Sequence, residues 1–179
     1  MKLEEQTKKT NIIFKGRVIQ LNHDEVILPN GEIGWREVVH HRGGVAILAI
    51  HEDNILLVKQ YRYPYHEVLY ECPAGKLEVE ETPEVTGKRE LREETGAIAL
   101  KLHSLGKMYP SPGYTDEVIY LYYTTDFSMT NASLDPDEFL QVEKIPFKEA
   151  LHWAQIGKIV DAKTIILLYR YLDVAKMSV

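Results

Sequence analysis

Apolar and polar positions follow one another along the chain in a way that predicts a mixed α/β protein. Residues 11–40 alternate between the two kinds and turn at Pro29-Asn30-Gly31, which predicts a meander of two or three short strands. Residues 44–50 form a nearly continuous apolar run, as expected for a buried central strand. The remaining periodic segments predict four more strands, at 55–61, 68–72, 97–108 and 118–125, and two helices, at 147–156 and 162–176.

The segment 75–97 is dense in charged residues and predicts a further helix. Thr82 offers a hydroxyl cap, Pro83 suits the first helical position, and Gly96 is typical of a helix end. The helix between them has about three and a half turns.

Three glutamates, Glu90, Glu93 and Glu94, share one side of this helix because they fall at positions i, i+3 and i+4. Nearby lysines and arginines could neutralise them as ordinary surface pairs, which is the common arrangement on a solvated helix. Alternatively, a cation between the carboxylates relieves their repulsion. Oxygen ligands favour Mg²⁺ or Mn²⁺ over zinc.

The spacing of the whole segment decides between these interpretations. Its defined positions are Gly75, Glu81, Arg89, Glu90, Glu93, Glu94 and Gly96. This pattern resembles the Nudix box of the Nudix hydrolases, which cleave a nucleoside diphosphate linked to another group. Ala97 stands where the box usually has a bulky aliphatic residue, a packing position that leaves the chemistry intact.

Composition and charge limit the classes of function. The chain has 179 residues, of which 45% are hydrophobic, and its formal charge of −6 argues against a nucleic-acid or membrane-surface partner. Its single cysteine, Cys72, excludes an internal disulfide and a cysteine-based zinc site, and we expect it to be buried. No signal peptide or membrane-spanning run is visible, so we expect a cytoplasmic protein.

Segments on either side of the box carry further candidate residues. Arg62 ends a predicted strand, either as a surface arginine stacked on tyrosines or as a ligand for phosphate oxygens. The strand–loop–helix connection should bring the Ala74 carbonyl, a good ligand for a hard metal, near the acidic helix face. Residues 126–138 are polar, and we expect a mobile loop there.

The resemblance is closest to the ADP-ribose pyrophosphatases and covers nearly the whole chain. It rests on the sequence ECPAG at 71–75, on Pro112 sixteen positions after Gly96, and on an N-terminal meander with an Arg-Glu pair. It implies a Nudix-type α/β/α sandwich with a mixed sheet at 43–179, preceded by a meander at 1–42. It also implies a homodimer in which the meander is exchanged between subunits.

Site residues follow from the same resemblance. It implies two or three Mg²⁺ ions, with Mn²⁺ as a substitute. The implied metal ligands are the Ala74 carbonyl, Glu90, Glu94, Glu93 and Glu78. Arg89 would pair with Glu81 or a neighbouring glutamate and hold the helix face in place.

Catalytic and substrate-binding roles are implied in the same way. Glu138 matches a catalytic glutamate of the loop, with Glu93 as the rival base and Glu117 as a weaker third candidate. The implied substrate contacts are Arg36 and Glu37 of the meander, Arg62 at the diphosphate, and Pro112 and Gly113 of the turn.

The expected reaction is hydrolysis of ADP-ribose, a small nucleotide, to AMP and ribose 5-phosphate. The alternatives are a broader nucleoside diphosphate sugar hydrolase and a Nudix domain that senses a ligand without catalysis. A sensor would have lost metal ligands, whereas this chain retains the glutamates of the box.

Overall fold

The computed structural model describes residues 2–177, which form two compact units. The first unit consists of the chain up to Gly43 together with Tyr109–Val118. The second contains Gly44–Met108 and the chain from Ile119 onward. Residues 109–118, which the sequence places within the catalytic domain, therefore group with the N-terminal segment.

The first unit is an antiparallel sheet of four strands: β1 (Gln6–Lys9), β2 (Ile12–Lys15), β3 (Ile19–Ile27) and β4 (Ile33–His41). β4 pairs with the whole of β3, while β1 and β2 pair with successive parts of the other edge of β3. The predicted turn at 29–31 joins β3 to β4. β1 was not predicted, because its residues, QTKK, are polar and exposed and give no periodic signal.

The turn at Tyr109–Val118 is attached to the end of β4. The Val39 N–H donates to the Tyr114 carbonyl at 2.7 Å, and the Asp116 N–H donates to the Val39 carbonyl at 3.2 Å. The Asp116 carboxylate also accepts the His41 N–H at 2.9 Å and lies 2.6 Å from His40 Nδ1. These contacts explain why the turn belongs to the first unit.

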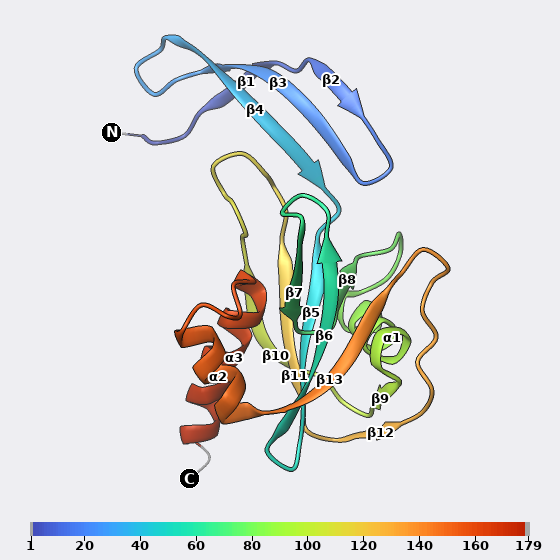
Figure 1. Ribbon diagram of the computed structural model, residues 1–179. Helices are drawn as coiled ribbons and strands as arrows, with labels where there is room; N and C mark the ends of the chain where they lie inside the picture. The colour runs from blue at the N-terminus through green and yellow to red at the C-terminus, as the bar shows by residue number, and fades with distance from the viewer. Residues whose placement is uncertain (1, 178–179) are drawn as a thin grey trace. The chain divides into compact units, whose positions relative to one another are not determined.

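The second unit is an α/β/α sandwich around a mixed sheet (Figure 1). The sheet order is β10 (His103–Met108), β11 (Ile119–Thr124), β5 (Gly44–His51), β6 (Asn54–Arg62) and β13 (Leu140–Pro146). β11 runs parallel to β5, and the other neighbouring pairs are antiparallel. β7 (Glu67–Glu71) pairs with β6, and β8 (Ala74–Lys76) pairs with β5.

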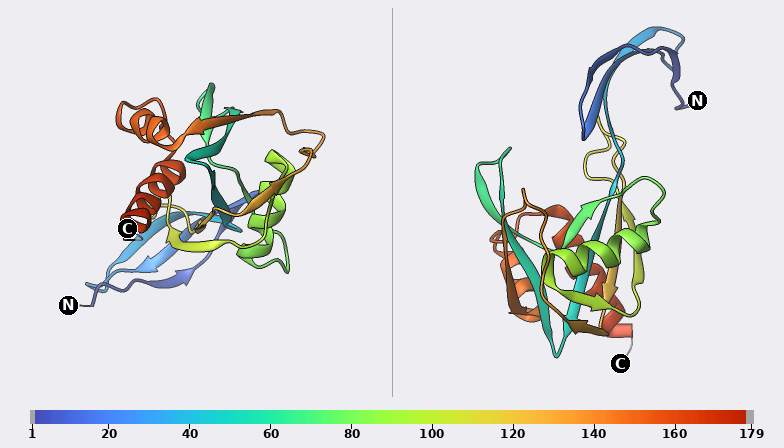
Figure 2. Two further views of the ribbon diagram at one scale, coloured as in Figure 1. Left: turned by 90° about the horizontal axis from the view of Figure 1, so that it is seen from below. Right: turned by 90° about the vertical axis from the view of Figure 1, so that its right-hand side faces the viewer.

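Helices cover both faces of this sheet (Figure 2). α1 (Pro83–Thr95) packs on one face, and α2 (Phe147–Gln155) and α3 (Ala162–Met177) pack on the other. β5 is apolar up to Ile50 because its successive side chains point to opposite faces and both faces are covered. Val45 and Ile47 pack with α1, whereas Ala46 and Leu48 pack with α2 and α3.

Three sequence expectations need correction. The single strand expected at 97–108 is two strands, because β9 (Ala97–Ala99) pairs with β12 (Phe127–Met129) while β10 pairs with β11. β12 therefore lies inside the segment expected to be a loop. β13 was missed because it is an edge strand with mostly exposed side chains, so its apolar pattern is weak.

Other expectations are confirmed. The central strands and the predicted helices are present within a residue or two of their expected ends, and Cys72 is buried. Within residues 2–177, no helix has the length and apolar composition needed to cross a bilayer.

Replacing Leu57 by alanine should lower the free energy of unfolding by about 2–5 kcal/mol, because this fully buried side chain would leave a cavity between the sheet and α3. Leu100→Ala is the control, since Leu100 is 71% exposed and its loss should change stability by about 0.5 kcal/mol at most. Urea denaturation of both variants measures the difference. Equal effects would contradict the described core.

Candidate active site

The charged segment forms the helix that its end signals predict. The Thr82 hydroxyl accepts the Val85 N–H at 3.4 Å, and Pro83 is the first helical residue. Gly96 ends α1 in the left-handed conformation with φ of 75°. A side chain at this position would also meet the Thr130 carbonyl oxygen at 2.1 Å, so the loop after β12 can approach only a glycine.

Two of the helix glutamates are buried against β8. Glu94 is 3% exposed and accepts the Ala74 N–H at 3.0 Å, and Glu90 is 9% exposed. A Cβ atom at Gly75 would lie 1.9 Å from Cδ of Glu90, so the close approach requires glycine. The 74–75 segment therefore meets the acidic face of the helix through the Ala74 N–H, while a ligand role for the Ala74 carbonyl stays a prediction.

Burial of these carboxylates makes the negative form costly. Burial is the main cause that raises the pKa of Glu94 to about 8, and the charges of Glu90 and Glu138 raise it further. The Ala74 N–H and Arg62 act in the opposite direction. Burial likewise raises the pKa of Glu90, although Arg89 opposes the shift. A pair of buried oxygen donors with raised pKa values fits a bound hard cation, which would favour their charged forms.

Arg89 pairs with several glutamates at once, as expected. Its Nε and Nη2 atoms donate to Glu81 at 3.0–3.3 Å, and its Nη1 atom donates to Glu90 at 2.9 Å and to Glu93 at 3.0 Å. Hydrogen bonding to Glu81 is the main cause that raises the pKa of Arg89. Arg89 therefore holds the glutamates in fixed positions.

The expected metal ligands are not gathered around one point in the described residues. In the described part of the chain, no three histidine, cysteine, aspartate or glutamate side chains are gathered closely enough to enclose an ion. Nη1 of Arg89 lies between Glu90 and Glu93, so a cation between these two would have to displace it. Glu78, another expected ligand, is exposed in the segment between β8 and α1.

Arg62 forms an ion pair with Glu71 at the end of β7. Its Nε and Nη2 atoms donate to the two carboxylate oxygens at 2.6 and 2.7 Å. Glu71 is buried, and Lys163 of α3 also donates to it. This contact of Lys163 was not predicted, because nothing in the sequence connects residues 92 positions apart.

Glu138 belongs to the loop that joins β12 to β13. The Ser133 N–H donates to the Glu93 carbonyl at 2.9 Å, and the Thr130 N–H donates to the Gly96 carbonyl at 2.7 Å, so the loop is fastened to the end of α1. The negative charge of Glu138 contributes to the raised pKa values of Glu90 and Glu94. The loop carboxylate therefore lies within electrostatic range of both.

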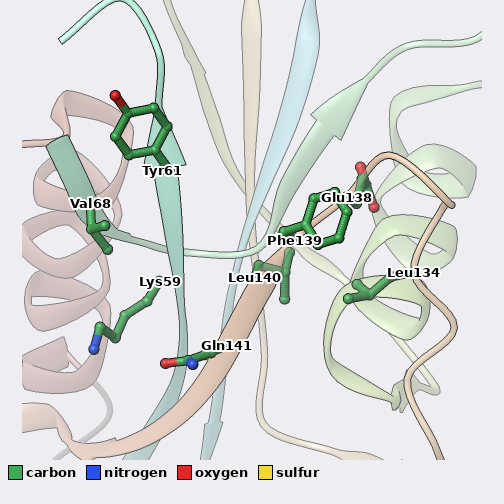
Figure 3. Close-up of a pocket in the computed structure, with 8 residues that line it drawn as sticks. All are labelled: Lys59, Tyr61, Val68, Leu134, Glu138, Phe139, Leu140 and Gln141. Carbon is green, nitrogen blue, oxygen red and sulfur yellow. The ribbon is translucent and has the colours of Figure 1, made fainter. Parts of the chain in front are cut away.

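A groove of about 510 Å³ opens beside Glu138 (Figure 3). Its lining residues are Lys59, Tyr61, Val68, Leu134, Glu138, Phe139, Leu140 and Gln141. Figure 3 shows Lys59, Tyr61 and Val68 on one side and the loop residues on the other. Phe139 is 80% exposed, so the groove has an apolar wall available to a ligand.

The remaining expected substrate contacts lie in the first unit. Arg36 pairs with Glu5 through two nitrogen atoms, and Glu37 is exposed on the same strand. Pro112 and Gly113 are exposed in the turn attached to β4. Glu117 of that turn lies 3.3 Å from His41.

An α/β/α sandwich whose helix buries glutamates against a glycine turn defines a Nudix-type fold. The family model described as the NUDIX domain matches residues 40–166. A second model, the nucleoside diphosphate sugar hydrolase N-terminal domain, matches residues 5–39. The chain therefore belongs to the Nudix family, as the sequence predicts.

Similar proteins carry related names. The chain is 44% identical to the "Methanol dehydrogenase activator" of Bacillus methanolicus, covering 95% of this chain and 93% of that one. It is 43% identical to the "ADP-ribose pyrophosphatase" of Bacillus subtilis, over 90% and 89%. It is 34% identical to the "GDP-mannose pyrophosphatase" of Yersinia pestis, over 74% and 72%.

A solved structure titled "Crystal structure of ADP compounds hydrolase" shares the fold. The TM-score is 0.88 at 18% identity, with 99% of this chain and 98% of the other covered. This likeness supports the described architecture.

Without metal, the Glu94→Gln variant should become more stable relative to the parent as the pH rises from about 5 to 8. The folded protein holds the Glu94 proton up to about pH 8, whereas the unfolded chain releases it near 4.5, so rising pH destabilises the parent more than the variant, which lacks this carboxyl group. We expect a difference of about 1–3 kcal/mol at pH 8.

The measurement is urea denaturation in EDTA at several pH values. Glu84→Gln, a change at an exposed carboxylate of the same helix, serves as the control. A difference between Glu94→Gln and the parent that does not change with pH would show that Glu94 titrates normally.

Proposed function

We propose that the protein is a Mg²⁺-dependent pyrophosphohydrolase that cleaves ADP-ribose to AMP and ribose 5-phosphate. The burial of Glu90 and Glu94 against the 74–75 segment carries this proposal, because it presents oxygen donors at one point of the fold. The name of the Bacillus subtilis relative supports ADP-ribose as the substrate. A cytoplasmic location remains part of the proposal.

The proposed metal ligands are Glu90, Glu94, Glu93, the Ala74 carbonyl and Glu78. Two or three Mg²⁺ ions, or Mn²⁺ in their place, would neutralise the diphosphate and lower the pKa of the attacking water. Because Arg89 bridges Glu81, Glu90 and Glu93, it would keep the carboxylates facing the same point before an ion binds. Binding of the ions would then be favoured, because they remove the repulsion between the carboxylates.

Glu138 is the proposed base that accepts the proton of the attacking water. Its charge already acts on Glu90 and Glu94, and the loop that carries it is anchored to α1. Glu93 is the rival, but its carboxylate already accepts a hydrogen bond from Nη1 of Arg89 at 3.0 Å. Glu117 is the third candidate and lies in the other unit.

Substrate recognition is proposed for residues of both units. Arg62, whose side chain is 38% exposed, would bind the diphosphate. Arg36, with Glu37 and an aromatic side chain of the meander, would contact the adenosine part. Pro112 and Gly113 would shape the same pocket from the turn.

Two other functions are supported by the relatives. The GDP-mannose pyrophosphatase of Yersinia pestis favours a broader hydrolase of nucleoside diphosphate sugars. The methanol dehydrogenase activator of Bacillus methanolicus favours an effect on a dehydrogenase. A ligand sensor without catalysis is less well supported, because no glutamate of the box is replaced.

Chromatography of the products from a substrate panel distinguishes these functions. The panel contains ADP-ribose, sugar nucleotides, dinucleotides and nucleoside triphosphates, each with Mg²⁺ and with Mn²⁺. Preference for ADP-ribose with release of AMP supports the proposal, and similar rates on sugar nucleotides support the broader hydrolase. Inactivity on every substrate, followed by stimulation of a purified methanol dehydrogenase, would support the activator function.

Glu138→Gln should lower kcat by about 10²- to 10⁴-fold and leave Mg²⁺ binding intact, because it removes a proton acceptor only. Glu94→Gln should abolish both Mg²⁺ binding and activity. Titration calorimetry and initial rates separate the two effects, with Asp137→Asn in the same loop as the control. Parental turnover and Mg²⁺ affinity in both glutamate variants would refute the assignment.

We also propose a homodimer, on the basis of the apolar surface of the first unit. Ile12, Ile13 and Phe14 of β2 are 58%, 62% and 54% exposed, and Trp35 of β4 is 52% exposed. Apolar side chains gathered on so small a sheet need a partner surface, and a second copy supplies one.

Light scattering after gel filtration tests the dimer. The parent should have the mass of two chains, and Ile13→Lys should shift it towards one chain, because a charge in an apolar interface is costly. Leu100→Lys, at an exposed position of the second unit, should leave the mass unchanged. A monomeric parent would exclude the dimer.

A further inference from the structure

A group of charged side chains, most of them largely buried, lies at the end of β7 and the start of α3. It consists of Glu71, Arg62, Lys163 and Asp161, and we call it the Glu71 cluster. The cluster contains two acids and two bases. Its members come from β6, from β7 and from the N-terminal end of α3, so it connects the helical layer with the strands that lead to the candidate active site.

Glu71 is the centre of the cluster. Its side chain is 2% exposed, one oxygen accepts Nε of Arg62 at 2.6 Å, and the other accepts both Nη2 of Arg62 at 2.7 Å and Nζ of Lys163. Burial acts to raise the pKa of Glu71, but Arg62 and Lys163 outweigh it and lower the pKa overall. The carboxylate is therefore held in its charged form.

Lys163 is held from two sides. Its Nζ atom donates to Glu71 and, at 2.8 Å, to Asp161, and its side chain is only 13% exposed. Burial acts to lower the pKa of Lys163, but Asp161 and Glu71 outweigh it, so the pKa is raised. With its ammonium group directed to two carboxylates, Lys163 is suited to orient other side chains.

The same end of α3 also fixes the strand segment that leads to Ala74. Asp161 accepts the Thr164 N–H at 3.0 Å and its hydroxyl at 2.6 Å. The Thr164 hydroxyl in turn accepts the Cys72 N–H at 2.7 Å. The side chain of Glu71 and the backbone of Cys72 are thus both bound to α3.

Arg62 is the member of the cluster that reaches the candidate active site. Arg62 pairs with Glu71, which precedes Ala74 by three residues, and the Ala74 N–H donates to Glu94 at 3.0 Å. The guanidinium is planar, so fixing Nε and Nη2 on Glu71 also fixes the direction of Nη1. Among the described residues no hydrogen-bond acceptor is found for Nη1, and the side chain is 38% exposed.

We propose that Lys163 is a positioning residue that sets the orientation of Arg62 for the diphosphate of the substrate. Lys163 shares an oxygen of Glu71 with Arg62 and balances the second acid, Asp161, so Arg62 keeps a two-point contact with Glu71 and presents Nη1 outward. This inference rests on the proposed function, because it assumes that Arg62 binds a diphosphate.

Kinetics of Lys163→Met test the proposal. The KM for ADP-ribose should rise about tenfold, which corresponds to a loss of about 1.4 kcal/mol in binding free energy. The kcat should change less than threefold. Lys163→Arg should restore most of the affinity, because it keeps the charge. In an Arg62→Ala background, Lys163→Met should have no further effect on KM.

Lys148→Met is the matched control, since Lys148 is an exposed lysine in the first turn of α2. The proposal would be overturned if Lys163→Met had the KM of the parent. It would also be overturned if adding Lys163→Met to Arg62→Ala raised KM as much as it does in the parent. If Lys163→Met does not fold, the double variant Asp161→Asn/Lys163→Met removes the second acid together with the lysine and leaves Glu71 paired with Arg62. It should then fold and show the same rise in KM.

Nuclear magnetic resonance gives a readout that does not need turnover. The Nε–H signal of Arg62, assigned by its loss in Arg62→Lys, should exchange slowly with water in the parent and at least tenfold faster in Lys163→Met. If the parent hydrolyses no nucleoside diphosphate, the proposed function fails, but this signal still shows whether Lys163 fixes Arg62. Unchanged exchange would show that it does not.

Discussion

The close contact between the Glu90 carboxylate and the backbone at Gly75 is the constraint on which the rest of the second unit depends. No other residue type fits at position 75, because a Cβ atom would overlap the carboxylate. The contact buries charge, which is unfavourable by itself. Arg89 and the Ala74 N–H offset part of that cost, and the sheet, α1 and the loop at 130–139 hold the arrangement in place.

The two layers of helices contribute differently to the site. α1 supplies the carboxylates. α3, on the opposite face of the sheet, supplies no expected ligand but binds Glu71 through Lys163 and Cys72 through Thr164. The strand segment at 71–76 therefore lies between an acidic helix and a helix that restrains it. Carboxylates gathered on one helix face need such restraint, because like charges brought together would otherwise move apart.

Local signals in the sequence predicted most of the fold. Thr82 and Gly96 delimit α1 correctly, and the uniform apolar character of β5 correctly indicated a strand covered on both faces. β1 and β13 could not be predicted, because edge strands with polar or exposed residues owe their conformation to pairing partners. The contact between Lys163 and Glu71 could not be predicted for a related reason, because the two residues are distant in sequence.

The attachment of residues 109–118 to β4 affects how this protein can be divided. A boundary near residue 43 looks like a simple junction between two modules, yet the backbone of Val39 bonds to Tyr114 and Asp116 on a segment inserted much later in the chain. Deleting the first 43 residues would strip that turn of its neighbours. The meander is therefore not an independent module. Its loss or its exchange by recombination would also require changes in residues 109–118.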